Sequence, residues 1–208
     1  MKFPLFQMGH IEQFFFHTDP TVDLAVIPIL PNQNVIDFKM LPDDLIADAK
    51  KFKELKITEG SDVFFTGMFT PHLGQQKNYP VVRFGKVALV TDEKVNWNGT
   101  PMDLYLIETS SYGGNSGSPV FFYLGADRDP GSLYVGPPQL FLAGIMMGAF
   151  QNIAPIQAIG TSVIPISTSN LGIAAVVPAN KLRELLDSDA MKAQRKALPT
   201  PAPTPTPR

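Results

Sequence analysis

The chain has 208 residues, an apolar content of 44% and a formal net charge of −2, values typical of a globular protein with a sizeable core. The small net charge gives no reason to expect a nucleic-acid partner. Cysteine is absent, which excludes disulfides, a cysteine nucleophile and cysteine-ligated metals. The three histidines form no His-x-x-x-His pair, so we expect no metal site.

Short apolar runs separated by prolines and glycines predict an all-β protein. In chain order, we expect strands near residues 2–7, 13–16, 24–29, 57–66, 81–90, 102–108, 119–124, 140–147, 160–164 and 171–177. Acidic residues after Pro42 and lysines further on predict a short helix over 43–52. A leucine stripe after Pro178 predicts a second helix over 179–194.

The two ends of the chain show no pattern of an export signal or a membrane span. Lys2 is the only positive charge of the first residues, and Pro4 interrupts their short apolar stretch. The chain as written is therefore expected in the cytoplasm.

Residues 197–208 alternate proline with threonine or alanine, a composition that favours an extended, disordered tail.

The most informative segment is a glycine-rich turn between two apolar runs, Gly113-Gly114-Asn115-Ser116-Gly117-Ser118-Pro119. Such a turn lets the backbone fold tightly around one hydroxyl, here that of Ser116. The N–H groups of Gly114 and Ser116 can then point at one spot, as the stabilisation of an oxyanion requires.

Two rival interpretations of this segment have to be weighed. It is one residue away from the hydrolase elbow Gly-x-Ser-x-Gly, but an elbow runs straight into a helix. Here Pro119 and a β-prone run follow instead. The other rival is a plain Gly/Ser turn without chemistry.

The segment resembles the Gly-x-Ser-Gly-Gly/Ser-Pro signature of trypsin-like serine peptidases of the PA clan, especially their disulfide-free bacterial branch of HtrA type. Four further segments are similar to strands of that family and occur in the right order: 22–29, 59–67, 84–89 and 171–180. In the family, the strand similar to 59–67 closes the first barrel and the one similar to 84–89 opens the second.

The resemblance implies a double β-barrel whose first barrel is incomplete, followed by a C-terminal helix. It divides the chain into a partial N-terminal barrel over 1–78 that carries Asp23, a second barrel with the helix over 79–196 that carries Ser116, and the tail over 197–208. In the implied Ser/His/Asp triad, Ser116 attacks a peptide carbonyl and Asp23 holds the His. The substrate would be a polypeptide, and no cofactor is needed.

The resemblance also assigns a pocket for the substrate side chain. Its base maps to Ser110, six residues before Ser116, and its wall to Ala143, Gly144 and Ile145. A preference for basic side chains needs a buried carboxylate at the base, which Ser110 does not supply. We therefore expect small or apolar side chains to be preferred.

No histidine of this chain has the place of the family's catalytic His. His10 and His17 precede Asp23 too closely for barrel strands to intervene, and His72 follows it, so we expect structural roles for all three. The catalytic His is then expected upstream of Met1, and this chain alone is expected to be inactive. The alternative is a peptidase fold that has lost its chemistry and serves as a binding or scaffold domain.

Overall fold

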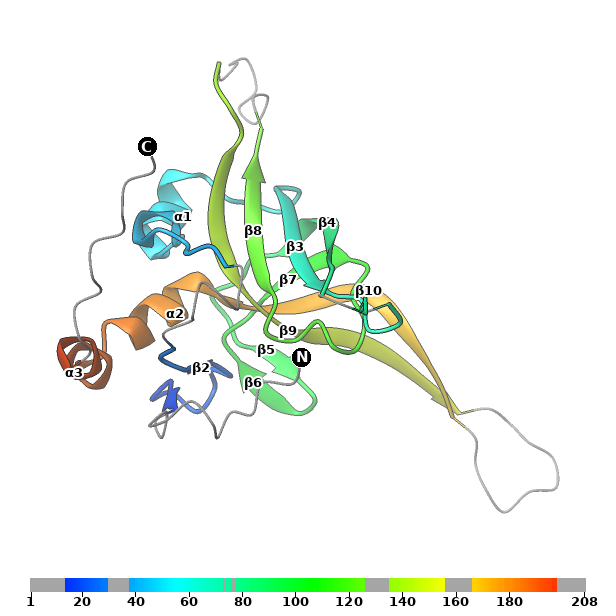
Figure 1. Ribbon diagram of the computed structural model, residues 1–208. Helices are drawn as coiled ribbons and strands as arrows, with labels where there is room; N and C mark the ends of the chain where they lie inside the picture. Colours follow the sequence, from blue (N-terminus) through cyan, green and yellow to red (C-terminus); the bar gives the residue numbers. More distant parts are fainter. Residues whose placement is uncertain are drawn as a thin grey trace.

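The computed structural model describes residues 14–29, 38–72, 74–75, 78–125, 135–155 and 166–197. Its centre is a closed barrel of six antiparallel strands in the order β10-β7-β4-β3-β8-β9. They are β3 (Asp62–Met68), β4 (Pro80–Leu89), β7 (Tyr105–Thr109), β8 (Pro119–Leu124), β9 (Gln139–Pro155) and β10 (Ile166–Pro178). Figure 1 shows that the far ends of β9 and β10 extend away from the barrel as a paired arm.

The interior of the barrel is filled by apolar side chains from every strand. β3 shows the pattern that produces this arrangement, because Val63 and Phe65 are buried while Asp62 is exposed. The cluster includes Val63, Phe65, Val87, Tyr105, Ile107, Val120, Phe122, Met146, Ala174 and Val176. Closure pairs both edges of each strand and leaves this core without an open sheet edge.

β3 belongs to the same barrel as β4. It pairs with β4 on one side and with β8 on the other, where Val63 lies opposite Phe122. The prediction that this strand closes a separate first barrel is therefore wrong. Within the described residues one barrel is formed, not two, and the boundary expected at residue 78 falls between two neighbouring strands of it.

Two small hairpins accompany the barrel. β1 (Phe15–Phe16) pairs with β2 (Ala25–Val26), and β5 (Val95–Trp97) pairs with β6 (Thr100–Met102). The strands expected at 13–16 and 24–29 are thus reduced to two residues each. The β5–β6 hairpin was not predicted, although Asn98 and Gly99 at its turn have φ values of 50° and 88° and form a favoured two-residue turn.

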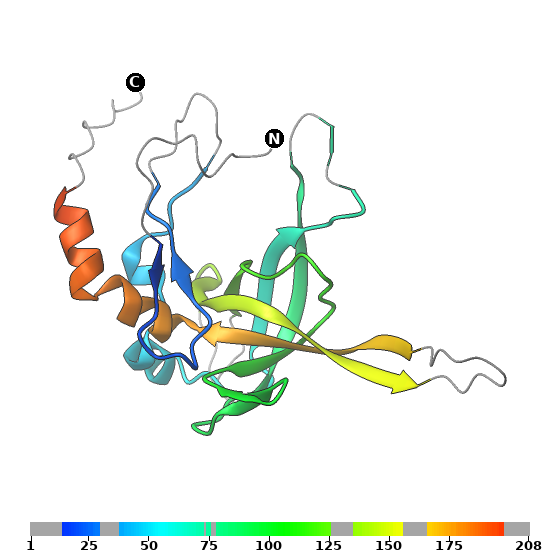
Figure 2. The same ribbon diagram turned by 90° about the horizontal axis from the view of Figure 1, so that it is seen from below.

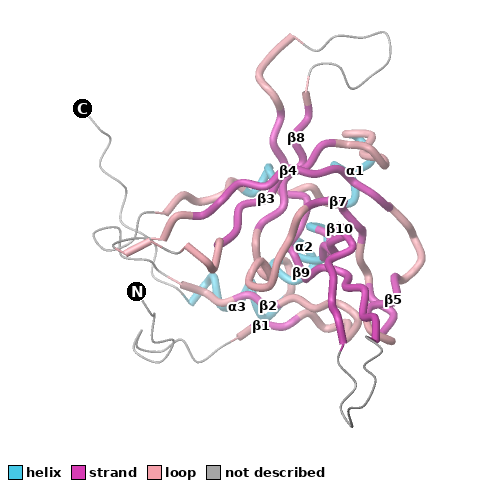
Figure 3. The backbone as a smooth tube through the Cα atoms, turned by 90° about the vertical axis from the view of Figure 1, so that its right-hand side faces the viewer, coloured by secondary structure: helices cyan, strands magenta, loops and turns pink. Residues whose placement is uncertain are grey.

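The C-terminal helices cover one side of the molecule. The expected helix over 179–194 is divided into α2 (Ala179–Leu186) and α3 (Asp189–Ala197). The division is explained by Ser188, whose side chain accepts a hydrogen bond from Met191 N at 3.3 Å and so caps a new helix. Figures 2 and 3 both place the β1–β2 hairpin beside these helices.

The helix expected over 43–52 is also shorter than predicted. It consists of a 3₁₀ turn η1 (Asp43–Leu45) and of α1 (Ala49–Glu54), whose first turn is capped by Asp48 through Lys51 N. Between the two, Ala47 N donates to Leu142 O at 3.0 Å, so the chain is held against β9. No helix among the described residues has the length and apolar character needed to cross a membrane.

A second apolar cluster joins the hairpins to the outside of the barrel. Val22 and Leu24 pack here with Met102 and Leu104, next to the α2 residue Leu185. Strands β9 and β10 are longer than the segments expected at 140–147 and 171–177. The strands expected at 2–7 and 160–164, and most of the expected tail, lie outside the described residues.

The barrel core yields a stability prediction. Phe122 is 0% exposed, whereas Phe84 is 70% exposed on the outside of the same barrel. We expect Phe122→Ala to lower the free energy of unfolding by about 3–5 kcal/mol, because it leaves a cavity. The matched change Phe84→Ala should cost about 1 kcal/mol or less. Urea unfolding curves measure both, and equal losses would contradict this placement of the core.

Candidate functional site

Ser116 lies in the loop that joins β7 to β8. Within the loop, Asn115 N donates to Tyr112 O at 3.2 Å and Ser118 N donates to Asn115 O at 3.1 Å. Two further bonds of 2.8 Å tie the loop to β9, from Gly117 N to Met146 O and from Met146 N to Ser118 O. The barrel therefore determines the position of Ser116.

The glycines of the loop give it a backbone that other residues rarely adopt. Gly114 has a φ of 98° and Gly117 a φ of 84°. The N–H groups of Gly114 and Ser116 donate no hydrogen bond to any described residue. These are the two donors that sequence analysis assigned to the oxyanion, and they are free for a ligand within the described part of the chain.

Asn115, between those two residues, lies beneath the loop. It is 2% exposed, and neither Oδ1 nor Nδ2 has a hydrogen-bond partner. The loop packs closely on β3 here, because a Cβ added at Gly67 would lie 2.8 Å from both Asn115 Oδ1 and Ser118 Oγ. Sequence analysis did not single out Asn115 or Gly67, since their contact joins segments far apart in the chain.

The Ser116 side chain is exposed and donates to Met147 O at 2.7 Å. The β9 residues beside the loop are thus Met146 and Met147. Of the expected pocket residues, Ala143 is part of the barrel core. Gly144 is packed against β10, where an added Cβ would lie 2.1 Å from Val177 O.

The other expected pocket residues lie nearer the surface. Ser110 is exposed at the start of the loop. Ile145 is half-buried beside the second apolar cluster, together with Met147. The expected pocket residues therefore do not share one surface beside Ser116.

Asp23 is exposed in the β1–β2 hairpin, between the buried residues Val22 and Leu24. Its carboxylate forms no hydrogen bond or ion pair with another described residue. The hairpin packs in the same cluster as Met147, whose carbonyl accepts the Ser116 hydroxyl. Asp23 and Ser116 are thus carried by segments that both approach β9 at Met147.

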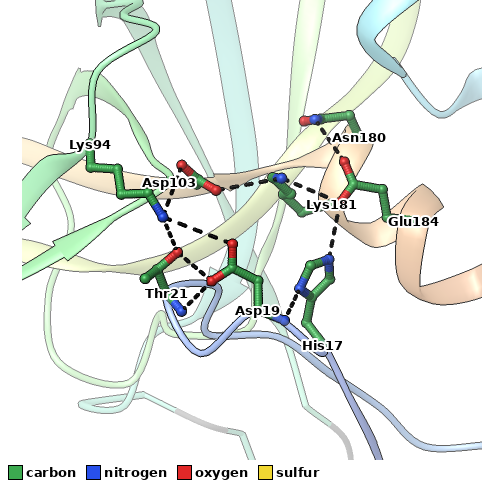
Figure 4. A network of polar contacts seen from close by, with 8 residues as sticks. All are labelled: His17, Asp19, Thr21, Lys94, Asp103, Asn180, Lys181 and Glu184. Carbon is green, nitrogen blue, oxygen red and sulfur yellow. Dashed lines mark hydrogen bonds and ion pairs between the residues drawn. The ribbon is translucent and has the colours of Figure 1, made fainter.

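The polar side chains of His17, Asp19 and Thr21, which precede Asp23 in the chain, interact with residues other than Asp23. Figure 4 shows a network that joins the β1–β2 connection to Lys94 and Asp103, which flank the β5–β6 hairpin, and to α2. Its members are His17, Asp19, Thr21, Lys94, Asp103, Asn180, Lys181 and Glu184. Lys94 Nζ donates to Thr21 Oγ1 at 2.6 Å, and Lys181 Nζ lies 3.4 Å from Asp103 and 3.3 Å from Glu184.

Both ring nitrogens of His17 have partners in this network. Asp19 N donates to Nδ1 at 3.1 Å, so Nδ1 is the acceptor and Nε2 carries the proton that points to Glu184 at 3.2 Å. Nδ1, the unprotonated nitrogen that a general base would use, is therefore already bound to Asp19 N. His72 is exposed in a turn, and His10 lies outside the described residues.

Two groups of the network have shifted pKa values. The hydrogen bonds from the Thr21 hydroxyl and N–H lower the pKa of Asp19, and Lys94 contributes less. Burial lowers the pKa of Lys181, but Glu184 and Asp103 outweigh this effect and the net shift is upward. Both shifts favour the charged forms that hold the hairpin on α2.

A cationic side chain missed by sequence analysis lies beside the loop. Arg83 of β4 has its guanidinium carbon 4.9 Å from the ring centre of Tyr112 and 5.9 Å from that of Phe69. Tyr112 is part of the Ser116 loop, and Phe69 follows β3. Exposed and less exposed residues alternate along β4, and Arg83 falls on the less exposed side with Gly85 and Val87. This alternation is the one feature of the sequence that could have pointed to Arg83.

The described part of the chain offers no group of three or more His, Asp or Glu side chains that could hold a metal ion. A groove of about 390 Å³ lies between β1 and α2, lined among others by Phe14, Phe16 and His17. It contains no residue of the Ser116 loop.

Comparison with protein-family models, with curated proteins and with solved structures gave no match. The chain has a six-stranded antiparallel β-barrel, and the trypsin-like resemblance stays a prediction drawn from its motifs.

Adjacent glycines of the loop allow a matched test of its geometry. Gly114→Ala places a Cβ at a φ of 98° and 2.9 Å from Thr70 Cγ2, whereas a Cβ at Gly113 meets no atom within 4 Å. We expect Gly114→Ala to lower the free energy of unfolding by about 1–3 kcal/mol. Gly113→Ala should leave it nearly unchanged in the same urea titration. The loop geometry would be refuted if the two changes had equal effects.

The network yields a prediction of pH dependence. Because the pKa of Asp19 is lowered on folding, its stabilisation is present above the ordinary value of 3.8 and is lost as pH falls through the folded pKa. Thr21→Val removes the largest cause of the shift and should raise this pKa. Carboxyl NMR titration measures it, with Thr18→Val as the control. An unchanged Asp19 pKa in Thr21→Val would show that the Thr21 hydroxyl is not the cause.

Proposed function

We propose that the barrel is the nucleophile-bearing part of a serine endopeptidase, with Ser116 as the nucleophile. The observation that carries the proposal is the state of the β7–β8 loop. Its serine hydroxyl is exposed, and the loop is hydrogen-bonded to β9 through Gly117 N and Ser118 O. The Gly114 and Ser116 N–H groups donate to no described residue. A hydroxyl with two free donors beside it suits attack on a carbonyl and stabilisation of the resulting oxyanion.

In the proposed reaction, Ser116 Oγ attacks the carbonyl carbon of a peptide bond as its proton passes to a histidine, which then donates it to the leaving amine. The hydroxyl leaves Met147 O to turn toward that base. The described histidines do not supply the base, so the proposal places it in a segment upstream of the described residues. Asp23 would orient it, because its exposed carboxylate has no described partner.

A second candidate function is a peptide-binding barrel without catalysis. It is favoured by the 2.7 Å bond from Ser116 Oγ to Met147 O and by the engagement of both His17 nitrogens. In that case the loop would bind a peptide backbone through the same N–H groups, and Ser116 would never form a covalent bond.

Labelling with a fluorophosphonate probe decides between the two. We expect the chain as given to react slowly, since loss of one triad member lowers kcat by up to about 10⁶-fold in a serine protease. A protein extended upstream to include a histidine-bearing segment should react rapidly and cleave casein. Ser116→Ala should abolish both reactions.

The neighbouring serine supplies the matched control. Ser118→Ala keeps the backbone bonds of the loop and should retain labelling. Labelling or turnover that survives Ser116→Ala would refute the nucleophile assignment. An extended protein that binds peptides but is never labelled would support the binding function instead.

A further inference from the structure

Arg83 lies against two aromatic rings next to the Ser116 loop. Its guanidinium carbon lies 4.9 Å from the ring centre of Tyr112 and 5.9 Å from that of Phe69, both within the range of a cation–π contact. Tyr112 O accepts the hydrogen bond from Asn115 N, and thus belongs to the same turn as the proposed oxyanion donors.

The guanidinium N–H groups of Arg83 are not engaged by the part of the chain that the structure describes. Arg83 forms no hydrogen bond or ion pair with a described residue. Its Nε is buried without a partner. An arginine that lies against aromatic rings and whose N–H groups are not engaged can bind a carboxylate through two parallel N–H bonds.

The pairing of β4 with β7 indicates at which end of the barrel Arg83 lies. Gly85 is opposite Thr109. This is the last pair of the ladder, and Arg83 lies two residues beyond it on β4, just as Ser111, next to the expected pocket base Ser110, lies two residues beyond it after β7. Ser110 by itself suggested small or apolar substrate side chains, but the structure adds, at the same end of the barrel, a cation that no described residue pairs.

We propose that Arg83 forms a carboxylate-binding subsite that selects peptides with a Glu or Asp side chain at the residue before the cleaved bond. The proposal rests on the proposed function for its peptide ligand. The rings of Tyr112 and Phe69 position the guanidinium, and its N–H groups, which have no described partner, can donate to the carboxylate of an acidic side chain. A neutral amide of the same shape would leave the cation without its charge partner.

Peptide binding tests this subsite without requiring catalysis. Fluorescence anisotropy would follow the Ser116→Ala protein with three labelled peptides, blocked at both ends and identical except for Glu, Gln or Lys at one position. We expect the Glu peptide to bind at least about tenfold more tightly than the Gln peptide, the scale of a charged hydrogen bond. The Lys peptide should bind most weakly.

Substitutions of Arg83 distinguish a binding role from a structural one. In Arg83→Met, which keeps an apolar side chain of similar length beside the rings, the Glu and Gln peptides should bind alike. Arg83→Lys should retain part of the difference, because it keeps the charge and loses the planar fork. A thermal unfolding curve establishes that each variant is folded.

A measurement on the unsubstituted arginine does not depend on how the variants fold. The NMR resonance of the Arg83 Nε–H group should move on addition of the Glu peptide and not of the Gln peptide. Equal affinities for Glu and Gln with Arg83 in place, an equal loss for all three peptides in Arg83→Met, or no binding of any peptide would overturn the proposal. Failure of the endopeptidase function would be recognised separately, as an extended protein that fluorophosphonate does not label.

Discussion

The hydrogen bonds between the Ser116 loop and Met146 are the constraint on which the site depends. Both the Gly117 N–Met146 O and Met146 N–Ser118 O bonds are 2.8 Å long, and they continue the β8–β9 ladder beyond its last paired residues. The loop is therefore an extension of the sheet, held at the barrel end in one conformation. The close approach of Gly67 to Asn115 fixes its other side. Preorganised donors of this kind need no rearrangement when charge develops.

The β1–β2 hairpin is attached by a different kind of force. It forms no strand pair with the barrel and is held by Val22 and Leu24 in an apolar cluster and by the ionic network on α2. The network is partly exposed, with side-chain exposures of 41% for Lys94 and 49% for Glu184, so its pairs contribute little energy singly. Apolar packing fixes the hairpin, and the charges determine which way His17 faces.

The sequence predicts local features well and long-range pairing poorly. Alternation along β3, β4 and β8 and the glycines around Ser116 identified these elements, because the strand period and the turn requirement act within a few residues. The membership of β3 in the barrel depends on its pairing with β8, which no local pattern encodes. Arg83 was missed for the same reason, since its neighbours Tyr112 and Phe69 come from other segments. The break before α3 was a missed local signal, the cap at Ser188.

The closure of the barrel by β3 and β8 has a consequence for synthesis of the chain. β3 emerges from the ribosome early but cannot complete its pairing until β8 follows, and contacts between distant segments form slowly. The Ser116 loop depends on a still later strand, since its backbone partners are Met146 and Met147. The nascent chain therefore carries Ser116 without its surrounding geometry, and the loop is assembled only after β9 has joined the sheet.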